Sequence, residues 1–149
     1  MSLYKHVVIA VDLHTSCDKT VIVRGLEVAK ANHAKVSLVH AVEHIMNAYG
    51  VAEAYSAAIE VEEQLVQEAK KTLQKLGKKF DIAPENQHIS VGTPRSEIIK
   101  KTHDLKADLL VVGSHGRHGF QLLLGSTANG VLHYAECDVL AVRVKDAVS

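Results

Sequence analysis

Four short apolar runs constrain the fold of this chain more than any other feature. They consist mainly of Val, Ile and Leu, and they occupy residues 7–11, 36–42, 109–112 and 139–144. Apolar runs that do not alternate with polar residues are typical of strands buried on both faces of a parallel sheet. A fifth run, residues 88–91, alternates and predicts a strand at the edge of the sheet.

Helical periodicity fills the intervals between the runs. Apolar residues recur at three- and four-residue steps in 18–32, in 57–79, after Pro94 and after Ser126. In the longest interval the stripe includes Leu65, and Gly77 supplies a stop. The alternation of strands and helices predicts an α/β fold with helices on both faces of a mostly parallel sheet. Residues 43–56 lack this periodicity and predict a connecting loop, with a lid over a ligand as the alternative.

Length and composition bound the class of protein. A chain of 149 residues predicts one domain spanning 1–149. Lys and Arg number 17, as do Asp and Glu, which argues against electrostatic binding to nucleic acid or an anionic membrane. No run is long and apolar enough for a membrane span. The two cysteines form no CxxC motif, so we expect a cytoplasmic protein.

Asp12 stands directly after the first buried run. A carboxylate at the end of a buried strand needs donors or solvent. It therefore contacts a ligand, or it caps the next helix or forms a turn with Ser16. Both interpretations stay open from the residues alone.

A glycine-rich segment follows the run at 109–112 and leads into the last predicted helix. It carries Gly113, Gly116 and Gly125, and then Ser126 and Thr127. Glycines let the backbone approach a ligand closely, and the N–H groups at a helix start favour an anion. The segment therefore predicts a phosphate cradle, which Arg117 or His118 would face; the alternative is a flexible loop with Ser126 as a simple N-cap.

Motifs of several enzyme classes are absent. The sequence has no GxxxxGK[ST], no GxGxxG after the first run and no GxSxG. The pair His40 and His44 and the pair His115 and His118 lack further ligands of a metal motif, so we expect no metal site of their own. No nucleophile and base can be paired, so we expect a protein that is not an enzyme.

Taken together, these segments resemble the universal stress protein family over essentially the whole chain. The resemblance rests on YKHVVIAVD at 4–12, KVSLVHAV at 35–42, VGTP at 91–94 with Glu97-Ile98-Ile99, and ADLLVVGSHGR at 107–117 with Gly125-Ser126. It implies a Rossmann-like three-layer sandwich around a five-stranded parallel sheet of order 3-2-1-4-5. It also implies a cytoplasmic homodimer that pairs partly through the last run, which begins at Val139 and ends at Val144.

The resemblance also implies a nucleotide site, because the ATP-binding branch of the family carries G-x2-G-x9-G-[ST]. ATP or AMP, with Mg²⁺ accompanying the nucleotide, would bind beside Asp12, against Ala41 and Val112, with the glycines and Ser126 around the ribose and phosphates. The full set of implied contacts is Val11, Asp12, Ala41, Val112, Gly113, Gly116, Arg117, Gly125, Ser126 and Thr127.

One departure from that pattern leaves other functions in competition. Eight residues, not nine, separate Gly116 from Gly125. We therefore weigh a stress-response protein that acts by binding a nucleotide against a nucleotide-free dimeric interaction module of the same fold, and against a slow ATPase.

Overall fold

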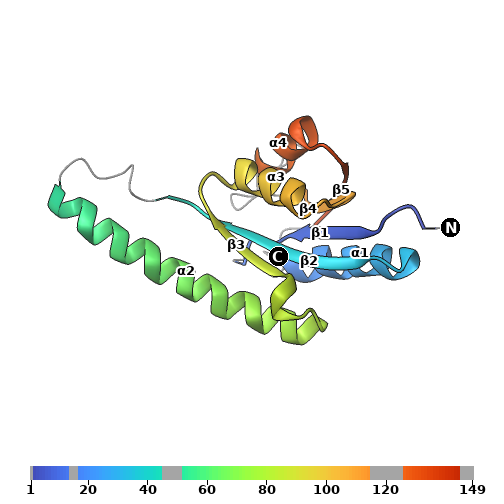
Figure 1. The fold of residues 1–149 in the computed structure, drawn as a ribbon, viewed down its shortest axis with the longest axis horizontal. Coiled ribbons are helices and arrows are strands. Elements are labelled where there is room, and N and C mark those ends of the chain that lie inside the picture. The colour runs from blue at the N-terminus through green and yellow to red at the C-terminus, as the bar shows by residue number, and fades with distance from the viewer. Residues whose placement is uncertain (1, 14–16, 45–51, 115–125, 145–149) are drawn as a thin grey trace.

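The computed structural model describes residues 2–13, 17–44, 52–114 and 126–144. Its elements alternate as the sequence predicts (Figure 1). The strands are β1 (His6–Ala10), β2 (Lys35–Val42), β3 (Gln87–Val91), β4 (Leu109–Gly113) and β5 (Asp138–Val142). The helices are α1 (Cys17–Asn32), α2 (Ala52–Phe80), α3 (Pro94–Asp104) and α4 (Ser126–Tyr134), with a short 3-10 turn at Pro84–Asn86.

The sheet is parallel throughout, and its order is β3-β2-β1-β4-β5. This confirms the predicted fold, including the edge position of β3. β5 is shorter than the predicted run because it ends at Val142, and Val144 instead donates its N–H to the Ser114 hydroxyl at 3.3 Å.

Two apolar layers cover the two faces of the sheet. One cluster joins Ile9, Leu38 and Val111 to Ile22 of α1 and Leu73 of α2. The other joins Val8 and Leu110 to Ile98 of α3 and Val131 of α4. The sheet therefore lies between α1 and α2 on one side and α3 and α4 on the other, as Figure 1 shows.

Helix α2 differs from the prediction at both ends. It begins at Ala52, so residues 52–56 are helical and not part of a loop. It also passes through Gly77, which is not a stop: a side chain there would collide with Gln87 Nε2. The helix ends after Phe80 because Asp81 takes a left-handed φ of 58° and the Ile82 N–H returns to the Gly77 carbonyl at 2.7 Å.

The apolar stripe of α2 is only partly buried. Leu73 is 2% exposed, whereas Leu65 is 39% exposed although both belong to the predicted stripe. The reason is geometric: the second half of α2 covers β2 and β3, and the first half extends beyond the sheet (Figure 1). Periodicity identifies the helix but not the length over which a sheet lies beneath it.

Candidate functional site

The carboxyl ends of β1 and β4 lie side by side at the centre of the sheet. The two strands are hydrogen-bonded neighbours, with Val7 opposite Leu109 and Ile9 opposite Val111. The chain runs outward from β1 to β2 and β3 on one side, and from β4 to β5 on the other. Ligands of open α/β sheets bind in the crevice at such a reversal of strand order. Asp12 and Gly113, which follow or end these two strands, therefore belong to one edge of the sheet.

The turn after β1 is held by Asp18. Its carboxylate, which is 7% exposed, accepts hydrogen bonds from the Asp12 N–H at 2.8 Å and the Leu13 N–H at 2.6 Å. Leu13 adopts a left-handed φ of 67°, which turns the chain toward α1. A side chain in the first turn of a helix thus fixes the backbone that presents Asp12.

The Asp12 carboxylate itself behaves differently from a cap. Asp12 is half-buried, and in the described part of the chain its side chain makes no hydrogen bond or ion pair. Ser16, the suggested turn partner, lies outside the described residues. Asp18, in the first turn of α1, instead accepts from the two backbone N–H groups that precede the helix, and no described residue pairs with the Asp12 carboxylate.

The neighbouring strand β2 supplies a second fixed contact. His40 is 8% exposed, and its Nδ1 lies 2.8 Å from the Val11 carbonyl oxygen. A carbonyl only accepts, so this ring nitrogen carries the proton and donates. The Val11 N–H in turn donates to the Val39 carbonyl at 3.0 Å. Val11 is therefore held at both of its backbone polar groups.

The predicted apolar contacts divide between the two faces of the sheet. Val112 packs in the cluster beneath α3 and α4. Ala41 is buried and shares the side of β2 with Val39 of that cluster, because side chains alternate along a strand. Val11 packs in the opposite cluster, beneath α1 and α2. The structure brings Ala41 and Val112 to one face and separates the Val11 side chain from them.

The start of the glycine-rich segment is anchored to β5. Gly113 is in register with Val142, and the Ser114 N–H donates to the Val142 carbonyl at 2.8 Å. Gly116, Arg117 and Gly125 lie outside the described residues. Ser126 begins α4, and Thr127 is half-buried in its first turn. Both ends of the predicted cradle are thus placed, and its middle is not described.

Asp18 and His40 were not singled out for these positions from the sequence. An acidic residue in the first turn of a helix suits the helix dipole, so Asp18 could have been found as a residue of that turn. His40 carried no such signal, because its partner is a backbone carbonyl 29 positions away. In the described part of the chain no three His, Cys, Asp or Glu side chains gather as metal ligands.

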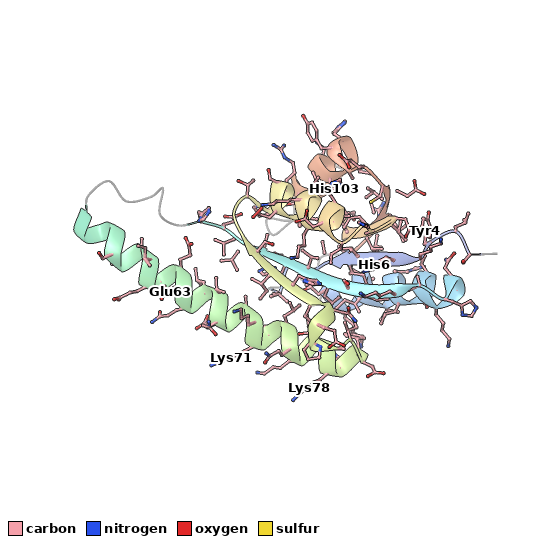
Figure 2. All side chains as sticks on the ribbon, viewed as in Figure 1. Tyr4, His6, Glu63, Lys71, Lys78 and His103 are labelled. Atoms are coloured by element: carbon pink, nitrogen blue, oxygen red, sulfur yellow. The ribbon has the colours of Figure 1, made fainter. Side chains whose placement is uncertain are left out.

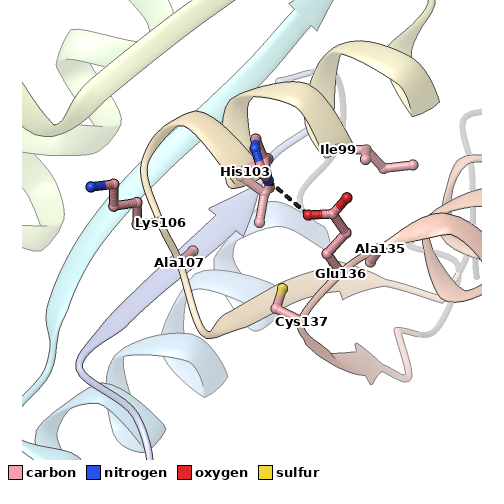
Figure 3. Close-up of a pocket in the computed structure, with 8 residues that line it drawn as sticks. Ile99, His103, Lys106, Ala107, Ala135, Glu136 and Cys137 are labelled. Carbon is pink, nitrogen blue, oxygen red and sulfur yellow. Dashed lines mark ion pairs between the residues drawn. The ribbon is translucent and has the colours of Figure 1, made fainter.

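A cavity of about 190 Å³ lies at the other end of the sheet, between α3 and the connection from α4 to β5 (Figure 3). His103 and Glu136 form an ion pair of 2.8 Å across it, and both side chains are exposed. Cys137, a free thiol, has its pKa raised, first by burial. A raised pKa disfavours the reactive thiolate of Cys137. No helix of the described residues is long and apolar enough to cross a membrane.

Comparisons with known proteins agree with this architecture. The model of the universal stress protein family matches residues 3–143. Universal stress protein A homolog 2 of Coxiella burnetii is 41% identical over 145 residues, which cover 97% of this chain and 99% of that protein. Homolog 1 of the same organism is 41% identical over 143 residues, with 96% and 99% covered.

Solved structures give the same result. Universal stress protein UspA from Lactobacillus plantarum superposes with a TM-score of 0.82 at 21% identity, covering 96% of this chain and 100% of that one. A universal stress protein in complex with cAMP superposes with a TM-score of 0.58 at 26% identity, covering 95% and 98%. The match of the family model and of the two Coxiella proteins over nearly the full length shows that this chain belongs to the universal stress protein family.

Proposed function

We propose that this protein binds an adenine nucleotide, ATP or AMP, at the carboxyl ends of β1 and β4, and that it acts in the stress response by binding and not by turnover. The observation that carries the proposal is the Asp12 carboxylate, which stands at the reversal of strand order with no partner in the described part of the chain. A relative in complex with cAMP supports a nucleotide as the ligand class.

The residues at this edge suit the separate parts of a nucleotide. A carboxylate such as Asp12 accepts hydrogen bonds from ribose hydroxyls. Ala41 and Val112 present small apolar side chains from one face of the sheet, which suits a base. Gly113 lets the chain pass close to the sugar, and the first turn of α4, with Thr127, offers N–H groups to phosphate oxygens. Mg²⁺ would accompany the phosphates, as it commonly does in nucleotide sites.

One contact of the described residues beside Asp12 supports binding without turnover. His40, which is buried in the neighbouring strand β2, commits its Nδ1 proton to the Val11 carbonyl. A general base must reach the proton that it abstracts, and no described side chain at this edge pairs with a nucleophile. Nucleotide occupancy would instead alter the surface that a partner meets.

We further propose a cytoplasmic homodimer that forms partly through β5. The strand lies at the edge of the sheet, and Val139, Leu140 and Ala141 are only half-buried. An unpaired strand edge offers a row of N–H and C=O groups to a second copy. A two-fold pairing of β5 with its symmetry mate would remove this edge from solvent.

The test is direct. The purified protein is denatured and the released small molecules are identified, and the thermal midpoint of the nucleotide-free protein is followed as ATP or AMP is added. Ligand at 100 times its Kd stabilises the folded state by about 2.7 kcal/mol. The absence of both released nucleotide and a thermal shift at millimolar ATP would overturn the proposal.

The absence of bound nucleotide would favour the nucleotide-free interaction module. One observation supports this second candidate. The spacing of eight residues between Gly116 and Gly125 is one shorter than in the ATP-binding pattern. A dimer that forms equally well with and without nucleotide, and a protein purified empty, would support that module.

A further inference from the structure

Helix α2 divides its charges into two blocks. All five of its glutamates lie at or before Glu68, and all five of its lysines lie at or after Lys70. The first block spans the part of the helix that extends beyond the sheet, and Figure 2 shows Glu63 in that part and Lys71 and Lys78 in the second. One helix therefore carries an acidic half and a basic half of equal and opposite charge.

The helix dipole does not account for this division. The dipole favours acidic residues in the first turn and basic residues in the last turn, and its effect fades within that turn. Glu60, Glu63 and Glu68 lie beyond the first turn of a helix that begins at Ala52, and Lys70 lies ten residues before its end at Phe80.

Pairing within the helix does not account for it either. Side chains three or four residues apart are neighbours, and like charges at this spacing destabilise a helix. The spacing joins like charges in Glu60–Glu63, Lys71–Lys75, Lys75–Lys78 and Lys75–Lys79. It joins opposite charges only in Glu68–Lys71. The arrangement is therefore unfavourable for α2 by itself.

The rest of the described chain does not neutralise these side chains. In the described segments, Glu60, Glu63 and Glu68 form no ion pair, and neither do the five lysines; Glu62 alone lies near a histidine, 3.3 Å from His44. Beside the acidic half, Val61 is 43% exposed and Leu65 lies four residues on, on the same flank. This flank therefore places exposed apolar side chains next to Glu60 and Glu63, which form no ion pair in the described segments.

We propose that α2 packs antiparallel against α2 of a second copy of this chain. In that arrangement the acidic half of each helix lies along the basic half of the other, whereas a parallel arrangement sets like charges together. A two-fold axis near the centre of the helix repeats the same contact twice, as symmetric dimers require. Val61 and Leu65 would be covered by the second half of the partner helix.

This surface is separate from the edge at β5. Helix α2 contacts β2 and β3, which lie at the opposite side of the sheet. Both contacts can form at once, and the α2 contact then doubles the number of copies in the assembly that forms through β5. Loss of one contact leaves the other intact, so the two proposals fail independently.

The experiment reverses the charge of each half in the full-length protein. One variant carries Glu60→Lys, Glu63→Lys and Glu68→Lys; the other carries Lys70→Glu, Lys71→Glu and Lys75→Glu. All six residues are exposed, so the fold is expected to persist, and circular dichroism with thermal melting checks this. Sedimentation measures the mass of each protein over a range of concentrations at about 0.05 M and 0.5 M salt, because salt screens exposed charges.

We expect each reversed variant to associate at least about tenfold more weakly than the wild type and to sediment at half its mass. A one-to-one mixture of the two variants regains the wild-type mass, as does the variant with all six changes, because opposite charges face each other again. The wild-type association weakens at high salt. Equal masses for the wild type and both reversed variants, or no recovery on mixing, would overturn the proposal.

Discussion

The two ends of the sheet treat their polar groups in opposite ways. At the amino ends of the strands, the Asp108 carboxylate and the His6 ring are hydrogen-bonded to the protein itself. At the carboxyl ends of β1 and β4, one carboxylate is bound in the same way and another is left without a described partner. The difference separates carboxylates that hold the fold from the Asp12 carboxylate, to which the proposed function assigns a ligand.

The amino end is a closed network. Asp108 accepts hydrogen bonds from the Lys5 N–H at 2.8 Å and the His6 N–H at 3.0 Å. The His6 ring lies between the Leu105 carbonyl, 3.0 Å from Nδ1, and the buried Ser37 hydroxyl, 2.8 Å from Nε2. Every one of these contacts joins segments distant in the sequence, so the network ties the start of β1 to β2 and to the chain before β4.

The pKa values at this end are shifted for structural reasons. Burial lowers the pKa of His6 and of His88. Burial acts to raise the pKa of Asp108, but the backbone N–H groups of His6 and Lys5 outweigh it and hold that pKa below its usual value. Shifted pKa values often mark functional sites, yet here the His6 ring and the Asp108 carboxylate already have hydrogen-bond partners within the protein.

The largest expected effect comes from Asp18, the bound carboxylate at the carboxyl end. Asp18→Ala leaves the N–H groups of Asp12 and Leu13 without their acceptor in a buried turn, and we expect the free energy of unfolding to fall by about 2–4 kcal/mol. Urea denaturation measures it. Asp18→Asn keeps one acceptor oxygen and serves as the matched control, with a smaller loss; an Ala variant as stable as the wild type would contradict the role of Asp18 in holding this turn.

Asp108→Ala tests the opposite end. Two backbone N–H groups lose a charged acceptor, so we expect the free energy of unfolding to fall by about 1–3 kcal/mol. The site at β1 and β4 is at the other end of the strands, so any nucleotide affinity stays within about twofold when measured well below the unfolding temperature. A large loss of nucleotide affinity together with an unchanged free energy of unfolding would show that Asp108 serves the ligand and not the fold.

Asp12→Ala tests the carboxylate that has no described partner, at the carboxyl end of β1. The side chain has no described partner to lose, so the free energy of unfolding should change by no more than about 0.5 kcal/mol. Nucleotide affinity, measured by calorimetry, should fall about tenfold, which is about 1.4 kcal/mol. Asp104→Ala, an exposed carboxylate at the end of α3, is the control. Unchanged affinity in the Asp12 variant would remove Asp12 from the proposed site.

The smallest effect concerns pH. Because the pKa of folded His6 and His88 lies below 6.5, the unfolded chain takes up protons first as the pH falls below that value. The free energy of unfolding therefore decreases as the pH is lowered from about 6.5 toward the lowered pKa values. Denaturation at pH 7, 6 and 5 measures this slope.

His6→Gln isolates one of the two groups. The amide can still meet the Ser37 hydroxyl but does not titrate, so we expect a flatter dependence on pH than in the wild type. His133→Gln, which removes an exposed imidazole on α4, is the comparison variant. A slope as steep in the His6 variant as in the wild type would show that His6 does not contribute.

Much of the fold follows from local pattern. The runs at 7–11 and 109–112 become central strands because apolar residues on both faces can only be covered from both sides. The alternating residues 88–91 become the edge strand β3 for the converse reason. Helix ends follow less directly. Gly77 predicts a stop, but the helix continues through it, and the close approach of the Gln87 side chain and the Ile82 carbonyl explains a glycine there.

At the candidate site, too, some features follow from the local sequence and others depend on the tertiary structure. The sequence determined that Asp12 and Gly113 would lie at the ends of buried strands, because strand ends are marked by a change from apolar to polar or small residues within a few positions. Only the tertiary structure decided that Asp18 holds the turn, with no described partner for the Asp12 carboxylate. It also decided that His40 binds the Val11 carbonyl and that the Val11 side chain faces away from Ala41 and Val112. Those outcomes depend on which segments meet across the sheet, and a hydrogen bond between residues 29 positions apart leaves no trace in the local order of the chain.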